Sequence, residues 1–125
     1  MVVCVAEFQR RIPVWERETD DGPIDFDVAG IVDSVPVDFK IIEVRIHLSG
    51  VGVAGNLTIT VDSDVGAEYD INLVTQDMSL VQDFIWRPAP RALFQAGEVV
   101  NIAWANANSL TYGLEVIWAH VRDGG

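Results

Sequence analysis

The sequence predicts an all-β fold: an antiparallel β-sandwich of the jelly-roll type, with seven to eight strands and an extended N-terminal segment. Apolar and polar residues alternate with a period of two from residue 39 onward, which is typical of half-buried strands. Turn residues separate the alternating runs at near-regular spacing, as in sandwiches and jelly rolls. No run shows the apolar period of an amphipathic helix. The length of 125 residues fits a single domain, spanning 1–125.

The N-terminal part, residues 1–38, differs in composition from the rest of the chain. Residues 2–8 predict a strand, and residues 28–32 predict one more short strand. Between these two, residues 16–27 hold six acidic residues against a single base, Arg17. This stretch predicts an acidic arm or an exposed loop.

We expect residues 13–27 to be an extended arm that docks on a neighbouring molecule. Six carboxylates cannot be buried in a sandwich without partners, because an unpaired charge is costly to desolvate. Trp15, Ile24 and Phe26 are spaced along this strip as anchors, and a few such anchors usually dominate the energy of a binding segment. The alternative is a solvated loop whose aromatic residues pack on their own domain.

The core strands are expected within residues 39–121. In the run 39–49, four aliphatic residues share one face and three polar residues share the other: Ile42, Val44, Ile46 and Leu48 against Glu43, Arg45 and His47. The other predicted strands are 56–63, 67–76, 80–86, 97–104 and 110–121, with a proline-containing loop or edge crossing at 87–91.

The last two strands predict a β-hairpin across residues 105–109. In one register, all the side chains on one face of the hairpin are large and apolar. A face of this kind is buried, and its burial fixes the register of the strands. Its aligned pairs are Trp104 with Leu110, Ile102 with Tyr112, and Val100 with Leu114. The hairpin therefore places Trp104 and Trp118 in the core rather than on a surface that stacks sugars. The asparagines of the connection supply turn chemistry, because Asn tolerates left-handed backbone angles.

Beyond Glu115, the last strand is apolar on both faces. Ile117, Ala119 and Val121 lie on the second face, and a strand that is apolar on both sides must be covered twice. The N-terminal segment or another subunit would supply this cover. We therefore expect a homo-oligomer, with these three residues in the interface.

Composition narrows the choice of partners. The net charge is −11, and Lys40 is the only lysine among eight basic residues. This balance argues against nucleic-acid binding, which requires a basic face. Half of the residues are apolar, which favours subunit contacts. No apolar stretch is long enough to span a membrane, and the start lacks the order of a secretory signal. We therefore expect synthesis in the cytoplasm, with Cys4 as a small buried residue.

Candidate chemistry is sparse. Four acidic residues lie within nine positions, at Asp62, Asp64, Glu68 and Asp70. They do not fit the EF-hand pattern, whose glycine and final glutamate positions hold Ala67 and Leu73. The acids at 18–27 could chelate a cation in the same way. His47 and His120 are expected on the surface, and no nucleophile motif is present. We therefore expect that the protein is not an enzyme and that it holds no metal ion or cofactor.

The order "LVQDFIWRP", "AGEVVNIAWAN" and "TYGLEVIW", within residues 80–118, resembles the C-terminal half of small β-sandwich proteins encoded by tailed phages. Such proteins decorate capsids or build head fibres and tail accessories. The resemblance implies a non-enzymatic structural protein of the virion, made in the host cytoplasm. It implies oligomerisation, with a trimer favoured over a dimer, and docking on capsid or tail proteins. No functional residue is carried over.

A carbohydrate-binding module is the alternative function, since such modules also favour jelly rolls, aromatic residues and acidic loops. It would need solvent-exposed tryptophan. Trp15 and Trp86 are the candidates, because the predicted hairpin buries the other two. A glycan therefore remains an alternative partner, and a non-viral scaffold subunit is a third interpretation.

Overall fold

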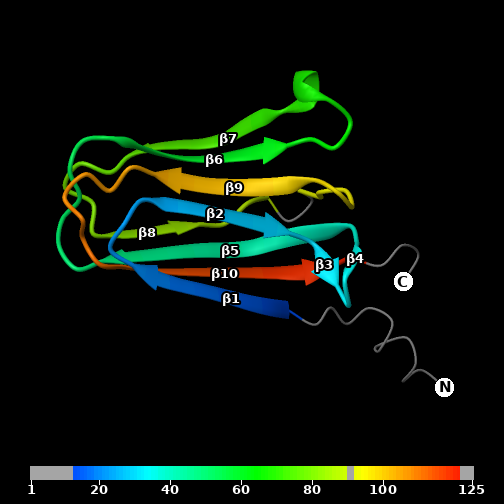
Figure 1. Ribbon diagram of the computed structural model, residues 1–125, viewed down its shortest axis with the longest axis horizontal. Coiled ribbons are helices and arrows are strands. Elements are labelled where there is room, and N and C mark those ends of the chain that lie inside the picture. The colour runs from blue at the N-terminus through cyan, green and yellow to red at the C-terminus, as the bar shows by residue number, and fades with distance from the viewer. Residues whose placement is uncertain (1–12, 90–91, 122–125) are drawn as a thin grey trace.

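The computed structural model describes residues 13–89 and 92–121, which form two four-stranded antiparallel sheets packed face to face (Figure 1). The β1 sheet has the order β1 (Pro13–Asp20), β10 (Tyr112–His120), β5 (Phe39–Leu48) and β8 (Asp83–Trp86). The β2 sheet has the order β2 (Ile24–Ala29), β9 (Val99–Trp104), β6 (Asn56–Asp62) and β7 (Ile71–Asp77). The prediction of an all-β antiparallel sandwich is confirmed.

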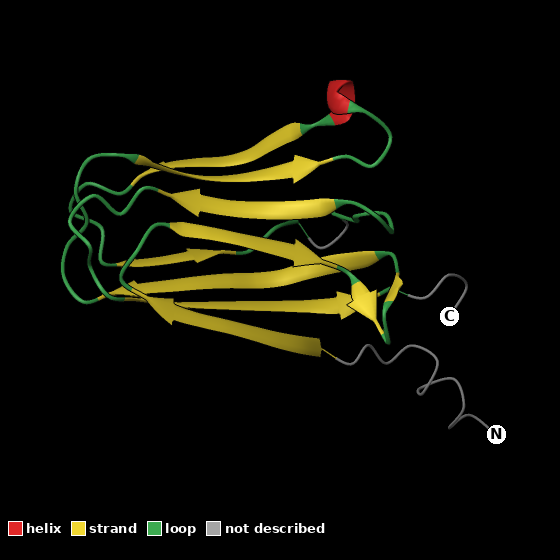
Figure 2. Cartoon of the chain, viewed as in Figure 1, coloured by secondary structure: helices red, strands yellow, loops and turns green. Residues whose placement is uncertain are grey.

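Little regular structure lies outside the two sheets. A two-stranded ribbon joins β3 (Ile31–Val32) to β4 (Val35–Pro36), and η1 (Ala67–Tyr69) is a single 3-10 turn. Figure 2 shows η1 in red, in the connection between β6 and β7. No helix among the described residues is long and apolar enough to cross a membrane.

The connections are those of a jelly roll. Of the eight sandwich strands, only β6 and β7 are both consecutive in the chain and neighbours in a sheet; every other connection passes from one sheet to the other. As a result, the successive strands β1 and β2 lie alongside β10 and β9, and β5 and β6 lie on the other side of the same two strands. This rolled arrangement of eight strands defines the jelly-roll architecture.

The core lies between the sheets, where the inward residues of each strand are buried. Trp104 and Trp118 are both buried, as predicted. Trp118 meets Phe39 edge to face at 5.9 Å between ring centroids, and Phe39 also contacts Phe94 at 5.3 Å. Offset and edge-to-face contacts of this kind favour aromatic packing beyond the area that they bury.

The predicted pairing of the last two strands is wrong. β9 pairs with β2 and β6, whereas β10 pairs with β1 and β5, so the two strands belong to different sheets. Residues expected side by side, such as Ile102 and Tyr112, instead line the two facing layers of one core. The alternation predicts the buried face of each strand correctly. It does not distinguish two strands that pair in one sheet from two strands that face each other across a core.

The asparagine predicted to supply turn chemistry has a larger role. Asn106, in the β9–β10 connection, has a left-handed backbone with φ of 52° and is buried. Its amide group donates to the carbonyl oxygens of Gly22 at 2.8 Å and Leu110 at 2.9 Å, and its side-chain oxygen accepts from the Leu110 N–H. One side chain therefore fastens the β9–β10 connection to the β1–β2 turn.

The prediction that residues 13–27 form a docking arm is also wrong. Residues 13–20 are β1, which pairs along its whole length with β10, and residues 24–29 are β2, which pairs with β9. The strand expected at residues 2–8 lies outside the described residues.

The acids of this segment are accommodated in two ways. Glu16 and Glu18 point inward at the sheet edge, where Glu16 accepts a hydrogen bond from the Trp118 indole and Glu18 accepts one from the Tyr112 hydroxyl. Burial raises the pKa of the Tyr112 hydroxyl to about 12, and the hydrogen bond to Glu18 is the second largest cause of this shift. Asp25 and Asp27 point outward on β2 and are exposed. The carboxylates that approach the core therefore have hydrogen-bond partners. The prediction of a docking arm had assumed that these carboxylates are unpaired, which would make their burial too costly.

Candidate functional site

The candidate site is the outer face of the β1 sheet, on which outward-pointing side chains form three rows across the strands. The strand registers define the rows. The first row is Thr19, Gly113, His47 and Asp83; the second is Arg17, Glu115, Arg45 and Ile85; the third is Trp15, Ile117 and Glu43, with Arg87 beyond the end of β8.

Five charged residues on this face form a continuous ion ladder. From one edge of the sheet to the other, the ladder consists of Arg17, Glu115, Arg45, Glu43 and Arg87. The Arg17 Nε donates to Glu115 Oε2 at 2.5 Å, and an Arg45 terminal nitrogen donates to Glu115 Oε1 at 2.9 Å. Glu43 accepts from the Nε atoms of both Arg45 and Arg87. Both carboxylates therefore bridge two guanidinium groups.

The arginines lower the pKa of both carboxylates. For Glu43 the main cause is the hydrogen bond from Arg45, followed by the one from Arg87, and together they outweigh the effect of desolvation. For Glu115 the hydrogen bond from Arg17 is the largest cause. The hydrogen bond to Glu43 raises the pKa of Arg45 in turn. Glu43 and Glu115 are therefore both charged at neutral pH.

Trp15 stands beside the ladder and is the large aromatic residue of this face. Its side chain is 46% exposed. The guanidinium carbons of Arg17 and Arg45 lie 5.4 and 5.6 Å from its ring centroid, within the range of cation–π attraction. Two cations therefore hold an exposed indole in place.

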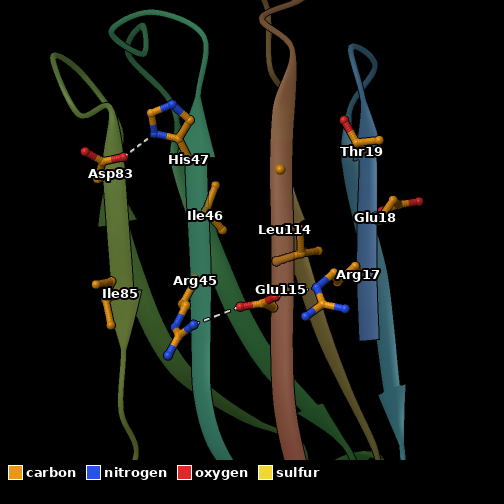
Figure 3. Close-up of a pocket in the computed structure, with 11 residues that line it drawn as sticks. Arg17, Glu18, Thr19, Arg45, Ile46, His47, Asp83, Ile85, Leu114 and Glu115 are labelled. Carbon is orange, nitrogen blue, oxygen red and sulfur yellow. Dashed lines mark hydrogen bonds and ion pairs between the residues drawn. The ribbon is translucent and has the colours of Figure 1, made fainter. Parts of the chain in front are cut away.

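A groove of about 640 Å³ runs over the first two rows. Figure 3 shows Thr19 and His47 on opposite sides of β10, with Arg17, Glu115 and Arg45 forming the next row below. Gly113 occupies the β10 position between Thr19 and His47. A Cβ atom at Gly113 would meet no other atom within 4 Å. The hollow therefore exists because this strand position has no side chain.

His47 is oriented by a neighbour. Its Nδ1 atom pairs with the carboxylate of Asp83 on the adjacent strand β8. Both side chains are largely exposed, as the sequence predicted for His47. An Asp–His pair fixes which ring nitrogen remains available, and here it is Nε2.

The six residues predicted to bind partners are not gathered on one surface. Trp15 lies on the outer face of the β1 sheet, but Ile24 is buried in the core and Phe26 is packed against it. The other three residues of that prediction lie at the end of the chain. Ile117 and Ala119 are buried within a single chain, and Val121 is half-buried.

Of the two covers expected for this stretch, the N-terminal segment or another subunit, the structure shows the first, because β1 pairs with it within the same chain. Ile117 lies between Trp15 of β1 and Glu43 of β5 on the outer face. A β-bulge follows, where β5 contains one extra residue, and it turns Ile42 to the outside. The prediction that Ile42 shares the buried face is wrong for this reason, since a bulge shifts the alternation by one residue. Oligomerisation itself stays a prediction.

The ion ladder was not predicted from the sequence. Glu43 and Arg45 were assigned to the polar face of a strand, but their partners on β1, β10 and β8 could not be paired without the sheet order. The available signal was the opposite charges of Glu43, Arg45 and Glu115 on predicted strands, whereas Arg17 lay in the predicted arm. Basic residues are rare in this chain, so the presence of three arginines on one face is stronger evidence that the face has a specific role.

The acidic groups considered as cation sites do not converge. Asp70 accepts a hydrogen bond from the Ser63 N–H, and Asp25 and Asp27 both accept from the Asn101 amide, at 2.7 and 2.8 Å. Among the described residues, no group of three or more His, Cys, Asp or Glu side chains is arranged to hold a metal ion.

The comparisons with known proteins give little further guidance. No model of a protein family matches the chain, and no curated protein matches it. Among solved structures, the crystal structure of the Yersinia pseudotuberculosis-derived mitogen is similar, with a TM-score of 0.37 and 14% sequence identity. The match covers 93% of this chain and 91% of that chain. A TM-score at this level supports no conclusion about function.

Proposed function

We propose that this protein is a non-enzymatic structural component of a tailed-phage virion, such as a decoration, head-fibre or tail accessory protein. It acts by docking on capsid or tail proteins through the outer face of the β1 sheet. The observation that supports this function best is the combination, on one face, of exposed Trp15 with three arginines held in an ion ladder. The virion assignment itself rests on the resemblance of residues 80–118.

This face carries the two residue types that most often anchor a protein interface. Tryptophan and arginine are enriched among the residues that contribute most to binding. The described arginines, Arg17, Arg45 and Arg87, all lie on this face. Because Glu43 and Glu115 already fix them, little side-chain freedom is lost when a partner binds, which reduces the entropic cost of docking.

Self-association forms part of the proposal. A homo-oligomer would place several copies of this face around one axis, and a trimer is favoured by the resemblance to phage proteins. Light scattering on the purified protein tests this part separately, and a stable monomer at tens of micromolar would contradict it.

The docking function is tested on virions purified from the host that carries this sequence. Quantitative mass spectrometry should find the protein in intact particles at a fixed stoichiometry. Trp15→Ala and Ile85→Asp, expressed in place of the wild-type chain, should reduce its incorporation at least about tenfold, as loss of an interface anchor does. The protein's absence from particles would contradict the proposal.

A matched control separates docking from folding. Ile71→Asp makes the same change as Ile85→Asp at a residue of equal exposure, 56% against 54%, on the other sheet. This variant should enter particles as the wild-type chain does. Equal loss of incorporation in both aspartate variants would contradict the assignment of the docking face.

A further inference from the structure

The groove over Gly113 has functional groups on its rim that the docking proposal does not use. Thr19 and His47 flank the bare position, two strand spacings apart, which is about 10 Å between their Cα atoms. At about 640 Å³, the groove lies within the size range of small-molecule sites. A ligand of one or two rings would fit between the two flanking side chains.

Hydrogen-bond donors face this groove from two sides. Arg17 uses its Nε atom in the ladder and its guanidinium also lies against the Trp15 ring, but its terminal nitrogens make no hydrogen bond among the described residues, and the side chain is 67% exposed. His47 uses Nδ1 to bind Asp83, so its Nε2 atom remains for a ligand. Arginine terminal nitrogens form the paired hydrogen bonds that suit a carboxylate.

Acceptors lie on the same rim. Asp83 and Glu115 place carboxylates beside the groove, and Thr19 adds a hydroxyl that both donates and accepts. These groups suit the hydroxyl groups of a sugar, which need acceptors as well as donors. The floor is backbone at Gly113, and Ile85 forms part of one side.

The rim chemistry disfavours two other ligand classes. An apolar ligand would desolvate the charged side chains without offering them a new hydrogen bond. A phosphate group carries up to two negative charges and would face stronger repulsion from Asp83 and Glu115 than a single carboxylate does. A polyhydroxylated ligand with a single negative charge satisfies both the donors and the acceptors.

We infer that the groove over Gly113 binds a sugar that carries one carboxylate, as in a uronic acid. Its carboxylate is held by the terminal nitrogens of Arg17, and its hydroxyl groups bond to His47, Asp83 and Thr19. This inference concerns the isolated chain and stands or falls independently of the virion proposal.

The test is a titration of the isotope-labelled protein with methyl glucuronide, followed by nuclear magnetic resonance. The backbone amide of Gly113 should shift in a saturable manner. Methyl glucoside, the neutral counterpart, and sodium acetate, the carboxylate without a sugar, should each bind at least about tenfold more weakly, because each lacks one set of charged or polar contacts.

Three variants locate the site. Gly113→Val places a side chain in the middle of the groove, where no atom lies within 4 Å of the added Cβ, and it should abolish the shifts while the protein stays folded. Arg17→Gln should weaken binding at least about tenfold. Arg87→Gln, an arginine of the same ladder that does not line the groove, should leave the affinity unchanged.

Several results would overturn the inference. They are the absence of a saturable shift, equal affinity for the neutral sugar or for acetate, and equal weakening by Arg17→Gln and Arg87→Gln. Binding that survives in the folded Gly113→Val variant would place the site elsewhere and would also overturn it.

Discussion

The two outer faces of this sandwich are built on the same alternation but differ in what they expose. The outer face of the β1 sheet has an ion ladder, an exposed indole and a groove. The outer face of the β2 sheet has threonines and carboxylates, including Thr58, Thr60, Asp25 and Asp27, and its described strands contain no basic residue. The inner faces, by contrast, form one apolar core, with Glu16 and Glu18 as polar exceptions at the edge of the β1 sheet.

The comparison shows where the sequence was free to vary. Inward positions must pack against one another in a dry core, so both inner faces have the same character. Outward positions need only keep the protein soluble, and on the β2 sheet threonine and carboxylate side chains are enough for that. The arginines and Trp15 of the β1 sheet go beyond what solubility requires, which favours a binding role for that face.

The largest expected effect distinguishes two isoleucines on the outer face of the β1 sheet. Ile117 is 6% exposed, whereas Ile85 is open to solvent. Ile117→Asp should lower the free energy of unfolding by about 4 kcal/mol, because it buries a carboxylate beside Glu43. Ile85→Asp should change it by less than about 0.5 kcal/mol.

Thermal unfolding followed by circular dichroism measures both changes. If the wild-type protein is an oligomer and the Ile117→Asp variant is a folded monomer, Ile117 is instead an interface residue, as predicted from the sequence alone.

The second prediction concerns acid stability and the ion ladder. Because the folded pKa values of Glu43 and Glu115 are lowered, their contribution to stability is present above the ordinary pKa of 4.5 and is lost as the pH falls through the lowered values. Glu43→Gln should therefore reduce stability at pH 7 and flatten its dependence on pH in the acid range.

Urea unfolding between pH 7 and pH 2 measures this dependence. Asp25→Asn removes one carboxylate from the opposite outer face and controls for the change in net charge. An equal flattening in both variants would show that the ladder has no special contribution.

A smaller effect is expected on the other outer face. Asn101→Ala removes the amide that bridges Asp25 and Asp27, leaving two carboxylates close together without a donor between them. The free energy of unfolding should fall by about 1 kcal/mol. Asn72→Ala, which breaks one exposed hydrogen bond to Thr75, should have less effect in the same urea titration.

The smallest effect has the opposite sign. Gly113→Val should raise the free energy of unfolding by about 0.5 kcal/mol, because valine suits an open strand position better than glycine. Gly97→Val is the contrasting control, since Gly97 has φ of 93° and its Cβ position lies 3.0 Å from Asp64. A calorimetric comparison should show stabilisation by the first change and destabilisation by the second.

Alternation along single strands made much of the fold predictable. It identified the strands of the core and the burial of Trp104 and Trp118, because each depends on residues close in sequence. It could not assign β9 and β10 to different sheets, since both arrangements bury the same faces. It also missed the bulge beside Ile42, which nothing in the local pattern announces.

The candidate site was less predictable, for a related reason. Trp15 was singled out, but as an anchor on an arm rather than as part of a sheet. The ladder joins residues as far apart in sequence as Arg17 and Glu115, and their meeting depends on the sheet order. Glu16 and Glu18 misled the argument from charge, because their partners Trp118 and Tyr112 lie at the other end of the chain.

The position of the last two strands has a consequence for synthesis on the ribosome. β9 and β10 are interior strands of their sheets, yet they are made after all the others. Until they emerge, β1 and β2 have no neighbouring strand, and the only pairs of sandwich strands that can form are β5–β8 and β6–β7. A nascent chain that ends before residue 99 therefore holds apolar strands without a completed core, and it should depend on chaperones until translation is nearly finished.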